Sequence, residues 1–281
     1  MEYIETTLGL RLPLVGFGTH KLHGQMLCDS VGKAYSMGYR LFDSAWLYKN
    51  EADLGRAFSQ NNIQVNDCIV TSKLSAMQLY FSIIGQSFCK SNPLKALKKS
   101  QKMLGGLDLY LLHSPFKKYD TIYKTLLESI RNTDGSLHFG VCNCGIEHLN
   151  NIHDTCGIWP EVNQIEIHPF RQQQSVVNFC QENGIVVEAY SPFGRGAILE
   201  ELNSNSTMNQ LSFEYGKTIT QIILRWITQK NIVALPRTRS ESHLAENLEI
   251  FDFQLSEAEI KQIAELDRGQ HYGKEFDKEY T

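Results

Sequence analysis

Four ionisable residues follow short apolar stretches of this chain, and together they could carry out proton transfer; they are Asp43, Tyr48, Lys73 and His113. A free phenol titrates near pH ~10 and is a poor acid at neutral pH. A neighbouring ammonium favours the phenolate and lowers the phenol pKa, while a carboxylate keeps the ammonium in place and charged. An imidazole can hydrogen-bond a carbonyl oxygen and orient it, or help to pass the proton. Such a set would protonate an oxyanion as it forms.

The elements that must position these residues alternate regularly along the chain. Short apolar strands are predicted at residues 14–17, 40–43, 68–71, 107–112, 138–142, 162–165, 185–189 and 232–235. Helices are predicted at 26–37, 51–60, 119–132, from 146, at 173–183, 208–229, 240–248 and 256–266. A further helix falls within residues 75–104, where Asn92 is predicted as an N-cap before Pro93. Strands that are apolar throughout are typical of a parallel sheet buried on both faces.

Eight strand–helix alternations without a linker favour an α/β fold in which residues 1–281 form a single (β/α)8 TIM barrel domain. Two short alternating runs within residues 3–13 predict an N-terminal β-hairpin that closes the bottom of the barrel. A doubly wound dinucleotide fold would need Gly-x-Gly-x-x-Gly after its first strand, and the run from Gly16 to Gly18 stops short of it. In a barrel, side chains at the C-terminal ends of strands form the catalytic face.

Composition argues against several classes of function. A net charge of −4 and a pI near 6.1 argue against a nucleic-acid binder. No apolar run approaches ~18 residues, and the N-terminus lacks an export signal, so no membrane association is expected. Seven cysteines, an odd number, fit free thiols in a reducing compartment, so we expect a cytoplasmic protein. Cys142 and Cys144 have no second pair at zinc spacing, so no metal is expected.

The stretch from Gly38 to Glu51, closed by Leu54-Gly55, resembles the signature of the aldo-keto reductases, which are NAD(P)H-dependent carbonyl reductases on a (β/α)8 barrel. Ile69–Leu74 is similar to the lysine strand of that family, and Asp108–Pro115 is similar to its histidine strand. The resemblance extends from residue 16 to about residue 255 and is weakest between residues 76 and 92. It implies Tyr48 as the general acid, Lys73 and Asp43 as the groups that tune it, and His113 as the group that orients the carbonyl.

The same resemblance implies a nicotinamide cofactor, because the protein itself cannot supply a hydride. The segments that contain Asn143 and Gln164 are similar to those that hold the nicotinamide carboxamide in the family. Cys142 stands where a serine is usual, so a weaker contact is expected there. Tyr190, followed by Ser191, is implied to stack on the nicotinamide ring.

The choice of cofactor depends on residues 235–247. Arg237 and Thr238 stand where the family has a Lys-Ser pair that grips the 2′-phosphate of NADP, and Asn247 matches an adenine contact. A later arginine of the family is replaced by His243. Since an arginine can bind a phosphate as well as a lysine can, NADPH is expected over NADH, with lower affinity than is usual in the family. NADH stays open as an alternative.

The substrate pocket departs from the family pattern. His20 and Ser114 stand where tryptophans are common, which implies a more polar and roomier pocket, and Trp46 is a candidate aromatic wall. The short loop after the seventh predicted strand resembles that of microbial-type reductases acting on small aldehydes, dicarbonyls or keto-sugars. We expect a monomer whose partner is a small carbonyl compound.

Two other functions stand as alternatives to the reductase. The barrel could be a catalytically silent, cofactor-binding or regulatory relative, but such a module has no need of a tuned phenol. It could also be a different barrel enzyme, such as an aldolase that uses Lys73 as a Schiff base. Asp43, Tyr48 and the nicotinamide-type segments disfavour the aldolase.

Overall fold

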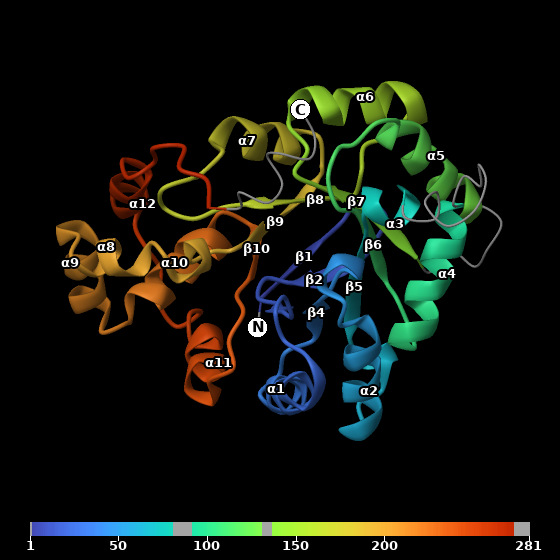
Figure 1. The fold of residues 1–281 in the computed structure, drawn as a ribbon. Coiled ribbons are helices and arrows are strands. Elements are labelled where there is room, and N and C mark those ends of the chain that lie inside the picture. Colours follow the sequence, from blue (N-terminus) through green and yellow to red (C-terminus); the bar gives the residue numbers. More distant parts are fainter. Residues whose placement is uncertain (1, 81–91, 131–136, 273–281) are drawn as a thin grey trace.

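Eight parallel strands form a nearly closed barrel in the computed structural model, which describes residues 2–80, 92–130 and 137–272 (Figure 1). Neighbours in the sheet are also neighbours in the sequence, so each strand pairs with the next. The strands are β3 (Phe17–Gly18), β4 (Leu41–Asp43), β5 (Ile69–Leu74), β6 (Leu109–Leu112), β7 (His138–Cys142), β8 (Val162–Glu166), β9 (Val186–Tyr190) and β10 (Ile232–Leu235). The barrel predicted from the alternating pattern is therefore confirmed.

Backbone contacts join the last strand to the first. Val15, just before β3, forms a parallel bridge with Ala234 in β10. The amide of Gly16 donates to the carbonyl of Ala234 at 2.9 Å, and the amide of Ala234 donates to the carbonyl of Leu14 at 2.8 Å. These bonds bring the ends of the sheet together, so the strand ends that carry polar side chains surround one opening.

Helices cover the outside of the barrel (Figure 1). They are α1 (Gly24–Ser36), α2 (Glu51–Gln60), α3 (Ala76–Tyr80), α4 (Pro93–Leu104), α5 (Tyr119–Ile130), α6 (Ile146–Cys156), α7 (Gln174–Glu182), α8 (Leu199–Asn203), α9 (Ser206–Tyr215), α10 (Ile219–Gln229), α11 (Glu241–Leu248) and α12 (Glu257–Ala264). Three short 3-10 turns lie at Trp46–Tyr48, Val65–Asp67 and Gly194–Gly196. The helices bury their apolar faces against the strands, which is how a parallel sheet is shielded on its outer face.

The side chains of each strand separate into two cores, because residues two apart on a strand face the same side. One buried cluster fills the barrel, and its members include Leu41, Leu109, Leu111, Val162, Val186 and Val233. The intervening residues, such as Phe42, Tyr110 and Val187, belong to the larger cluster shared with the helices. Strand residues that share the parity of the inner cluster therefore point into the barrel.

The N-terminal hairpin closes the opposite end of the barrel, as predicted. Its strands are β1 (Tyr3–Glu5) and β2 (Arg11–Pro13), which pair antiparallel. Leu10 and Leu12 join the inner cluster. The hydroxyl of Thr6 donates to the carboxylate of Glu161 at 2.6 Å, next to the start of β8. The hairpin thus seals the apolar interior from below and leaves the C-terminal ends of the strands open.

Most predicted elements lie within two or three residues of those observed, and one helical stretch is an informative exception. Asn92 caps α4 as expected, since its side chain accepts from the amide of Leu94 at 2.9 Å. The single helical stretch predicted at 208–229 is divided into α9 and α10. Gly216, with φ of 61°, ends α9, and Thr218 and Gln221 form a capping box that starts α10. The part of the predicted third helix at residues 81–91 lies outside the described residues.

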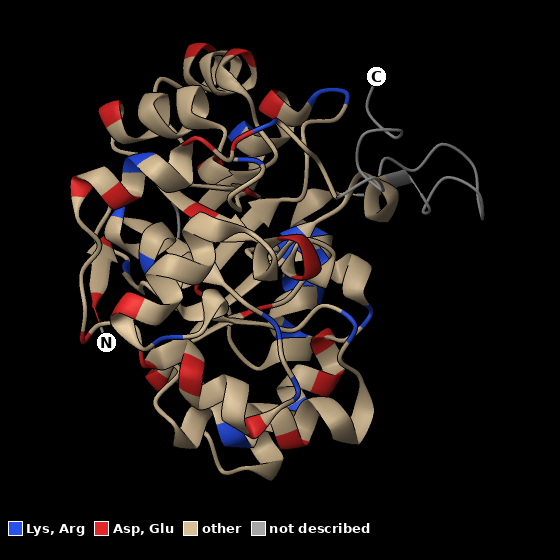
Figure 2. Cartoon of the chain, turned by 90° about the vertical axis from the view of Figure 1, so that its left-hand side faces the viewer, with Lys and Arg blue, Asp and Glu red and all other residues tan. Residues whose placement is uncertain are grey.

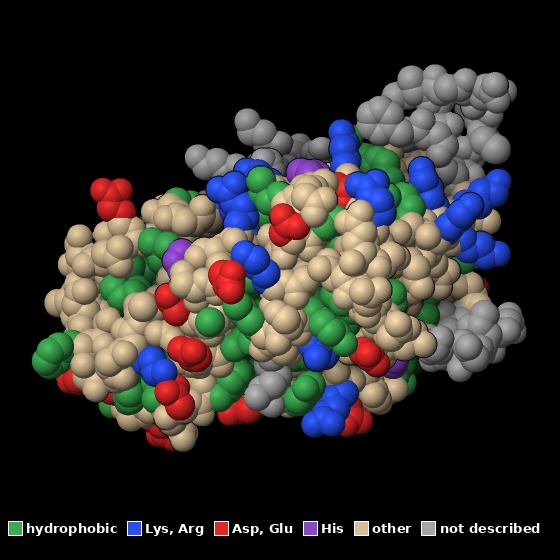
Figure 3. Space-filling view, turned by 90° about the horizontal axis from the view of Figure 1, so that it is seen from below, with side chains coloured by type: hydrophobic (Ala, Val, Ile, Leu, Met, Phe, Trp, Pro, Cys, Tyr) green, Lys and Arg blue, Asp and Glu red, His purple; other side chains and the backbone are tan. Residues whose placement is uncertain are grey.

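Charged side chains of both signs are interspersed over the surface. Figure 2 shows this along the helices, and Figure 3 shows it for the face seen from below. Among the helices within residues 2–80, 92–130 and 137–272, none has the length and apolar character that crossing a bilayer requires. The six cysteines in this part of the chain are free thiols.

Gly140 offers a test of how tightly the barrel is packed. A Cβ atom added there would lie 2.5 Å from the carbonyl oxygen of Val162 and 2.7 Å from a methyl of Leu111. We expect Gly140→Ala to lower the free energy of unfolding by about 1–3 kcal/mol, because neighbouring strands must separate. Gly145→Ala is the control, since its nearest neighbour would be 3.8 Å away. Chemical denaturation measures both, and equal stability of the two variants would contradict this packing.

Candidate active site

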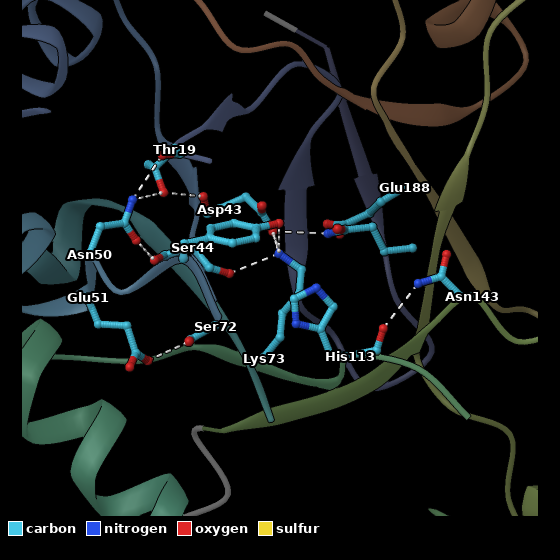
Figure 4. Close-up of polar contacts among 12 residues, drawn as sticks. Thr19, Asp43, Ser44, Asn50, Glu51, Ser72, Lys73, His113, Asn143 and Glu188 are labelled. Carbon is cyan, nitrogen blue, oxygen red and sulfur yellow. Dashed lines mark hydrogen bonds and ion pairs between the residues drawn. The ribbon is translucent and has the colours of Figure 1, made fainter. Parts of the chain in front are cut away.

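A buried ion pair joins β4 and β5 at the open end of the barrel (Figure 4). Lys73 and Asp43 share the parity of the inner cluster, so both side chains point into the barrel. The Nζ atom of Lys73 lies 2.5 Å from Oδ1 of Asp43, 2.8 Å from the carbonyl oxygen of Ser44 and 3.4 Å from Oη of Tyr48. Burial disfavours the charged ammonium, but the Asp43 carboxylate, together with the neighbouring Tyr48 and Cys142, more than offsets burial and raises the pKa of Lys73. The lysine therefore stays charged although it is 1% exposed.

Tyr48 is held beside this pair by a network of small polar side chains (Figure 4). It ends a 3-10 turn, and the next residue, Lys49, adopts a left-handed conformation. Asn50 then becomes fully buried. Its amide donates to the backbone carbonyl of Thr19 at 2.9 Å and accepts from the hydroxyl of Ser44 at 2.8 Å. These bonds tie the turn to the ends of β3 and β4 and thereby fix the phenol over the lysine.

The pKa of Tyr48 differs from the sequence-based expectation. Lys73 does lower it, as anticipated, but burial has the larger effect and raises the pKa of Tyr48 to about 12. The expectation of a lowered Tyr48 pKa is therefore wrong. Removing water from around a phenol penalises the phenolate more than one shared ammonium favours it, because Asp43 already neutralises most of that charge. The phenol keeps its proton at neutral pH.

His113 follows β6 and completes the group of four. Its ring centroid lies 5.8 Å from that of Tyr48, edge to face. Burial, with the nearby charge of Lys73, lowers the pKa of His113 well below its ordinary value, so the imidazole is neutral. The ring centroid of His20 lies 4.8 Å from that of Tyr48. Two imidazoles are therefore in contact with the phenol ring.

These groups form the floor of a cleft with a volume of about 540 Å³. Most of the predicted site residues line it, namely His20, Asp43, Tyr48, His113, Cys142, Asn143, Gln164, Tyr190, Ser191, Arg237, Thr238, His243 and Asn247. Lys73 lies beneath the floor, in contact with the phenol. Two expected substrate residues do not line the cleft: Ser114 is buried, and Trp46 lies outside the lining. Leu47, next to Trp46, lines it instead.

Two amides line the cleft next to the phenol. Asn143 donates from Nδ2 to the carbonyl oxygen of His113 at 3.1 Å (Figure 4). Its Oδ1 accepts from the hydroxyl of Tyr190 at 2.9 Å. Gln164 donates from Nε2 to Oδ1 of Asp43 at 3.0 Å. Between them Cys142 is a neutral thiol, because burial raises its pKa well above the ordinary value. Amides can both donate and accept, so this wall can bind a planar group that does the same.

The sequence reasoning missed a second carboxylate in the barrel. Glu188 in β9 is fully buried, and its Oε2 accepts from Nε2 of Gln164 at 2.8 Å. Burial and the nearby Asp43 carboxylate raise the pKa of Glu188 to about 7. A signal was available, since Glu188 is the one charged residue in the strand predicted at 185–189. Lys21, Arg195 and Phe193 also line the cleft and were not anticipated.

Comparison with known proteins places this arrangement in a family. Residues 15–268 match the model of the aldo/keto reductase family. The chain is 32% identical to a glyoxal reductase of Bacillus subtilis (strain 168), covering 94% of this chain and 92% of the relative. It is 31% identical to the methylglyoxal reductase DkgA of Escherichia coli O157:H7, covering 95% and 94%. A solved aldo-keto reductase in complex with NADPH is 27% identical, with a TM-score of 0.84 over 96% of this chain and 89% of that one.

Glu188 makes the stability of the protein depend on pH in a way that can be measured. Its pKa is raised from the ordinary 4.5 to about 7 in the folded chain, so the folded state binds a proton that the unfolded state has released. This contribution to stability is present at low pH and is lost as the pH rises toward 7 and above. Glu188→Gln does not titrate. We expect its free energy of unfolding, relative to the native chain, to rise by on the order of 2 kcal/mol between pH 5 and pH 8. Urea denaturation at both pH values tests this, and a constant difference would contradict it.

Proposed function

The chain belongs to the aldo/keto reductase family, and from that premise we propose that it is an NADPH-dependent reductase of small aldehydes and ketones, dicarbonyls and keto-sugars included, with Tyr48 as general acid. One observation carries the proposal: a protonated phenol lies at the floor of the cleft, 3.4 Å from a buried ammonium that is held charged. A module that only binds a cofactor has no use for that contact.

The four polar groups divide the proton chemistry among them. Tyr48 keeps its proton until a carbonyl oxygen gains negative charge, and then donates it to that oxygen. The phenolate that remains lies beside the Lys73 ammonium, which stabilises it, and Asp43 keeps the ammonium charged. His113 is neutral and can therefore hydrogen-bond the carbonyl oxygen and orient it without adding a charge. Solvent returns the proton to Tyr48 afterwards.

The cleft fits a nicotinamide cofactor along its length. When bound, NADPH supplies the hydride that the protein cannot. Asn143 and Gln164 would hold the carboxamide, with Tyr190 against the ring and Cys142 and Ser191 close by. At the other end, Arg237, Thr238, His243 and Asn247 line the same cleft and would hold the adenosine 2′-phosphate end. A solved aldo-keto reductase with the same fold is in complex with NADPH, and this supports the assignment.

The substrate end favours small, polar carbonyl compounds. The wall beside Tyr48 is formed by the imidazole of His20 rather than by a larger aromatic ring. Leu47 and Met77 add a short apolar surface. Two of the relatives described above are named as glyoxal and methylglyoxal reductases, so these dicarbonyls are the first substrates to try.

Removing the phenol hydroxyl tests the proposed general acid. Tyr48→Phe keeps the ring and its contacts with the two imidazoles, so we expect NADPH affinity within about threefold of the native value and a kcat at least about 10³-fold lower. Oxidation of NADPH, followed at 340 nm with methylglyoxal, gives kcat, and fluorescence titration gives the affinity. The control is Tyr119→Phe, which removes a hydroxyl bonded to the carbonyl of His148, away from the cleft.

Two outcomes would contradict the function. If Tyr48→Phe retained more than about a tenth of the native rate, another group would be the acid. If the native chain bound NADPH but turned over none of the dicarbonyls, aldehydes or keto-sugars, it would be a catalytically silent cofactor-binding protein.

Arg237 tests the choice between NADPH and NADH. It is exposed and lines the cleft, whereas Arg239 is exposed and does not line it. A charge-assisted bond to phosphate is worth roughly 1.5–3 kcal/mol, so Arg237→Ala should weaken NADPH binding about 10- to 100-fold. NADH binding should change by less than about twofold, since NADH has no 2′-phosphate. Arg239→Ala is the control for loss of surface charge. Equal losses for both coenzymes in Arg237→Ala would show that the assignment is wrong.

A further inference from the structure

The Glu188 carboxyl group has no part in the proton transfer described above, although it is close to the groups that do. It shares the parity of Val186, which belongs to the inner cluster, and so points into the barrel. In the sheet it stands directly beside Gln164 on β8. A buried carboxyl group is costly where an apolar side chain would fill the same space. The strand is otherwise made of Val186, Val187, Ala189 and Tyr190, so the position calls for a specific reason.

The contacts of Gln164 supply that reason. Its Nε2 atom carries two hydrogens, and two carboxyl oxygens receive them: Oδ1 of Asp43 at 3.0 Å and Oε2 of Glu188 at 2.8 Å (Figure 4). In both contacts the carboxyl oxygen is the acceptor, so the nitrogen end of the amide faces inward. Since Gln164 also lines the cleft, the amide oxygen is the atom left to face a ligand.

Asp43 alone would hold the Gln164 amide less firmly in this orientation. The same Oδ1 atom already accepts from Nζ of Lys73 at 2.5 Å, and that charged donor competes for it. Glu188, by contrast, makes no ion pair within the described part of the chain, and its Oε2 accepts from Gln164 at 2.8 Å. The Glu188 carboxyl group therefore engages the second N–H of the amide, and a flipped amide would place its oxygen against the Asp43 carboxylate.

We propose that Glu188 is a positioning residue: it fixes the Gln164 amide with its oxygen toward the cleft, so that a nicotinamide can bind only with the N–H₂ of its carboxamide toward Gln164. This inference rests on the proposed function, since it concerns how the proposed cofactor is oriented. It gives the enzyme control over which face of the nicotinamide ring meets the substrate.

Asn143 complements this arrangement from the adjacent strand end. The Tyr190 hydroxyl donates to its Oδ1, and one N–H of its Nδ2 donates to the carbonyl oxygen of His113. The second N–H remains to be offered to a ligand. One side of the nicotinamide site thus presents a donor and the other an acceptor, which matches a carboxamide in one orientation and opposes the reverse.

Binding measurements without substrate test the role directly. Glu188→Leu is expected to raise the Kd of NADPH about tenfold, as the loss of one well-oriented hydrogen bond would. The Kd of 2′,5′-ADP, which contains the phosphate end and no nicotinamide, is expected to stay within about twofold. Glu188→Gln keeps an acceptor toward Gln164 and should restore NADPH affinity to within about threefold of the native value. Glu188→Gln thus distinguishes the effect of losing the hydrogen bond to Gln164 from the effect of losing the negative charge.

A second measurement reports which face of the nicotinamide ring transfers its hydride. The native enzyme should transfer deuterium from NADPH labelled at one of the two C4 positions, and Glu188→Leu should transfer measurable deuterium from both. If Glu188→Leu bound NADPH as the native chain does, or lost affinity for NADPH and 2′,5′-ADP equally, the positioning role would be overturned. In that case the reductase proposal would stand, whereas failure of the native chain to bind NADPH would overturn the reductase proposal itself.

The native chain provides a measurement that does not depend on the folding of any variant. The 3-acetylpyridine analogue of NADP⁺ keeps the carbonyl group and lacks the N–H₂. If Gln164 presents its oxygen, the analogue should bind about tenfold more weakly than NADP⁺. Equal affinities would mean that the amide oxygen does not face the cofactor, and the inference would be wrong.

Discussion

The ion pair between Lys73 and Asp43 is the interaction on which the rest of the site depends. A charged ammonium that is 1% exposed is stable only if its charge is met at once by an acceptor of opposite sign and by further hydrogen bonds. The Asp43 carboxylate and the carbonyl oxygen of Ser44 provide both. Removing one partner of such a pair usually costs about 3–5 kcal/mol, so the barrel must hold β4 and β5 in register for the site to exist at all.

The barrel supports that pair from below and from the side. Below it, the inner apolar cluster, sealed by the N-terminal hairpin, keeps water away and strengthens every electrostatic contact at the floor of the cleft. Beside it, Asn50 ties the turn that carries Tyr48 to the ends of two strands. On the far side, Gln164 shares the Asp43 carboxylate and is itself held by Glu188. In the proposed function, proton transfer and cofactor orientation would therefore be coupled through the Asp43 carboxylate.

Much of this organisation could be predicted from the sequence, because it follows from local rules. The alternation of side chains along a buried strand places Asp43, Lys73 and Gln164 inside a barrel. The pair Asn92-Pro93 indicates the start of a helix. The division of residues 208–229 into two helices was also encoded, by Gly216 and Thr218, but a continuous apolar pattern concealed it. The single acid in the apolar strand at 185–189 marks Glu188 as unusual, but its role depends on Gln164, which only the sheet register places beside it.

Other features depend on three-dimensional context that no local pattern carries. The direction of the pKa shift of Tyr48 results from two opposing effects: desolvation raises the pKa, and the ammonium of Lys73 lowers it. Which effect is larger depends on how deeply the ring is buried. Likewise, the sequence pattern predicts His20, Ser114 and Trp46 at the substrate wall, and of these only His20 lines the cleft in the described part of the chain. Leu47 takes the place of its neighbour Trp46. Substrate walls are formed by loops, and small changes in loop path decide which side chain lines them.

A crystal structure of the chain with NADP⁺ bound is the measurement that tests the account most directly. The account predicts that the nicotinamide lies at the floor of the cleft beside Tyr48, with its carboxamide between Asn143 and Gln164 and its N–H₂ toward Gln164. It also predicts that the Lys73–Asp43 contact persists in the complex. A cofactor bound elsewhere, or a nicotinamide turned away from Tyr48, would contradict the assignment of the site.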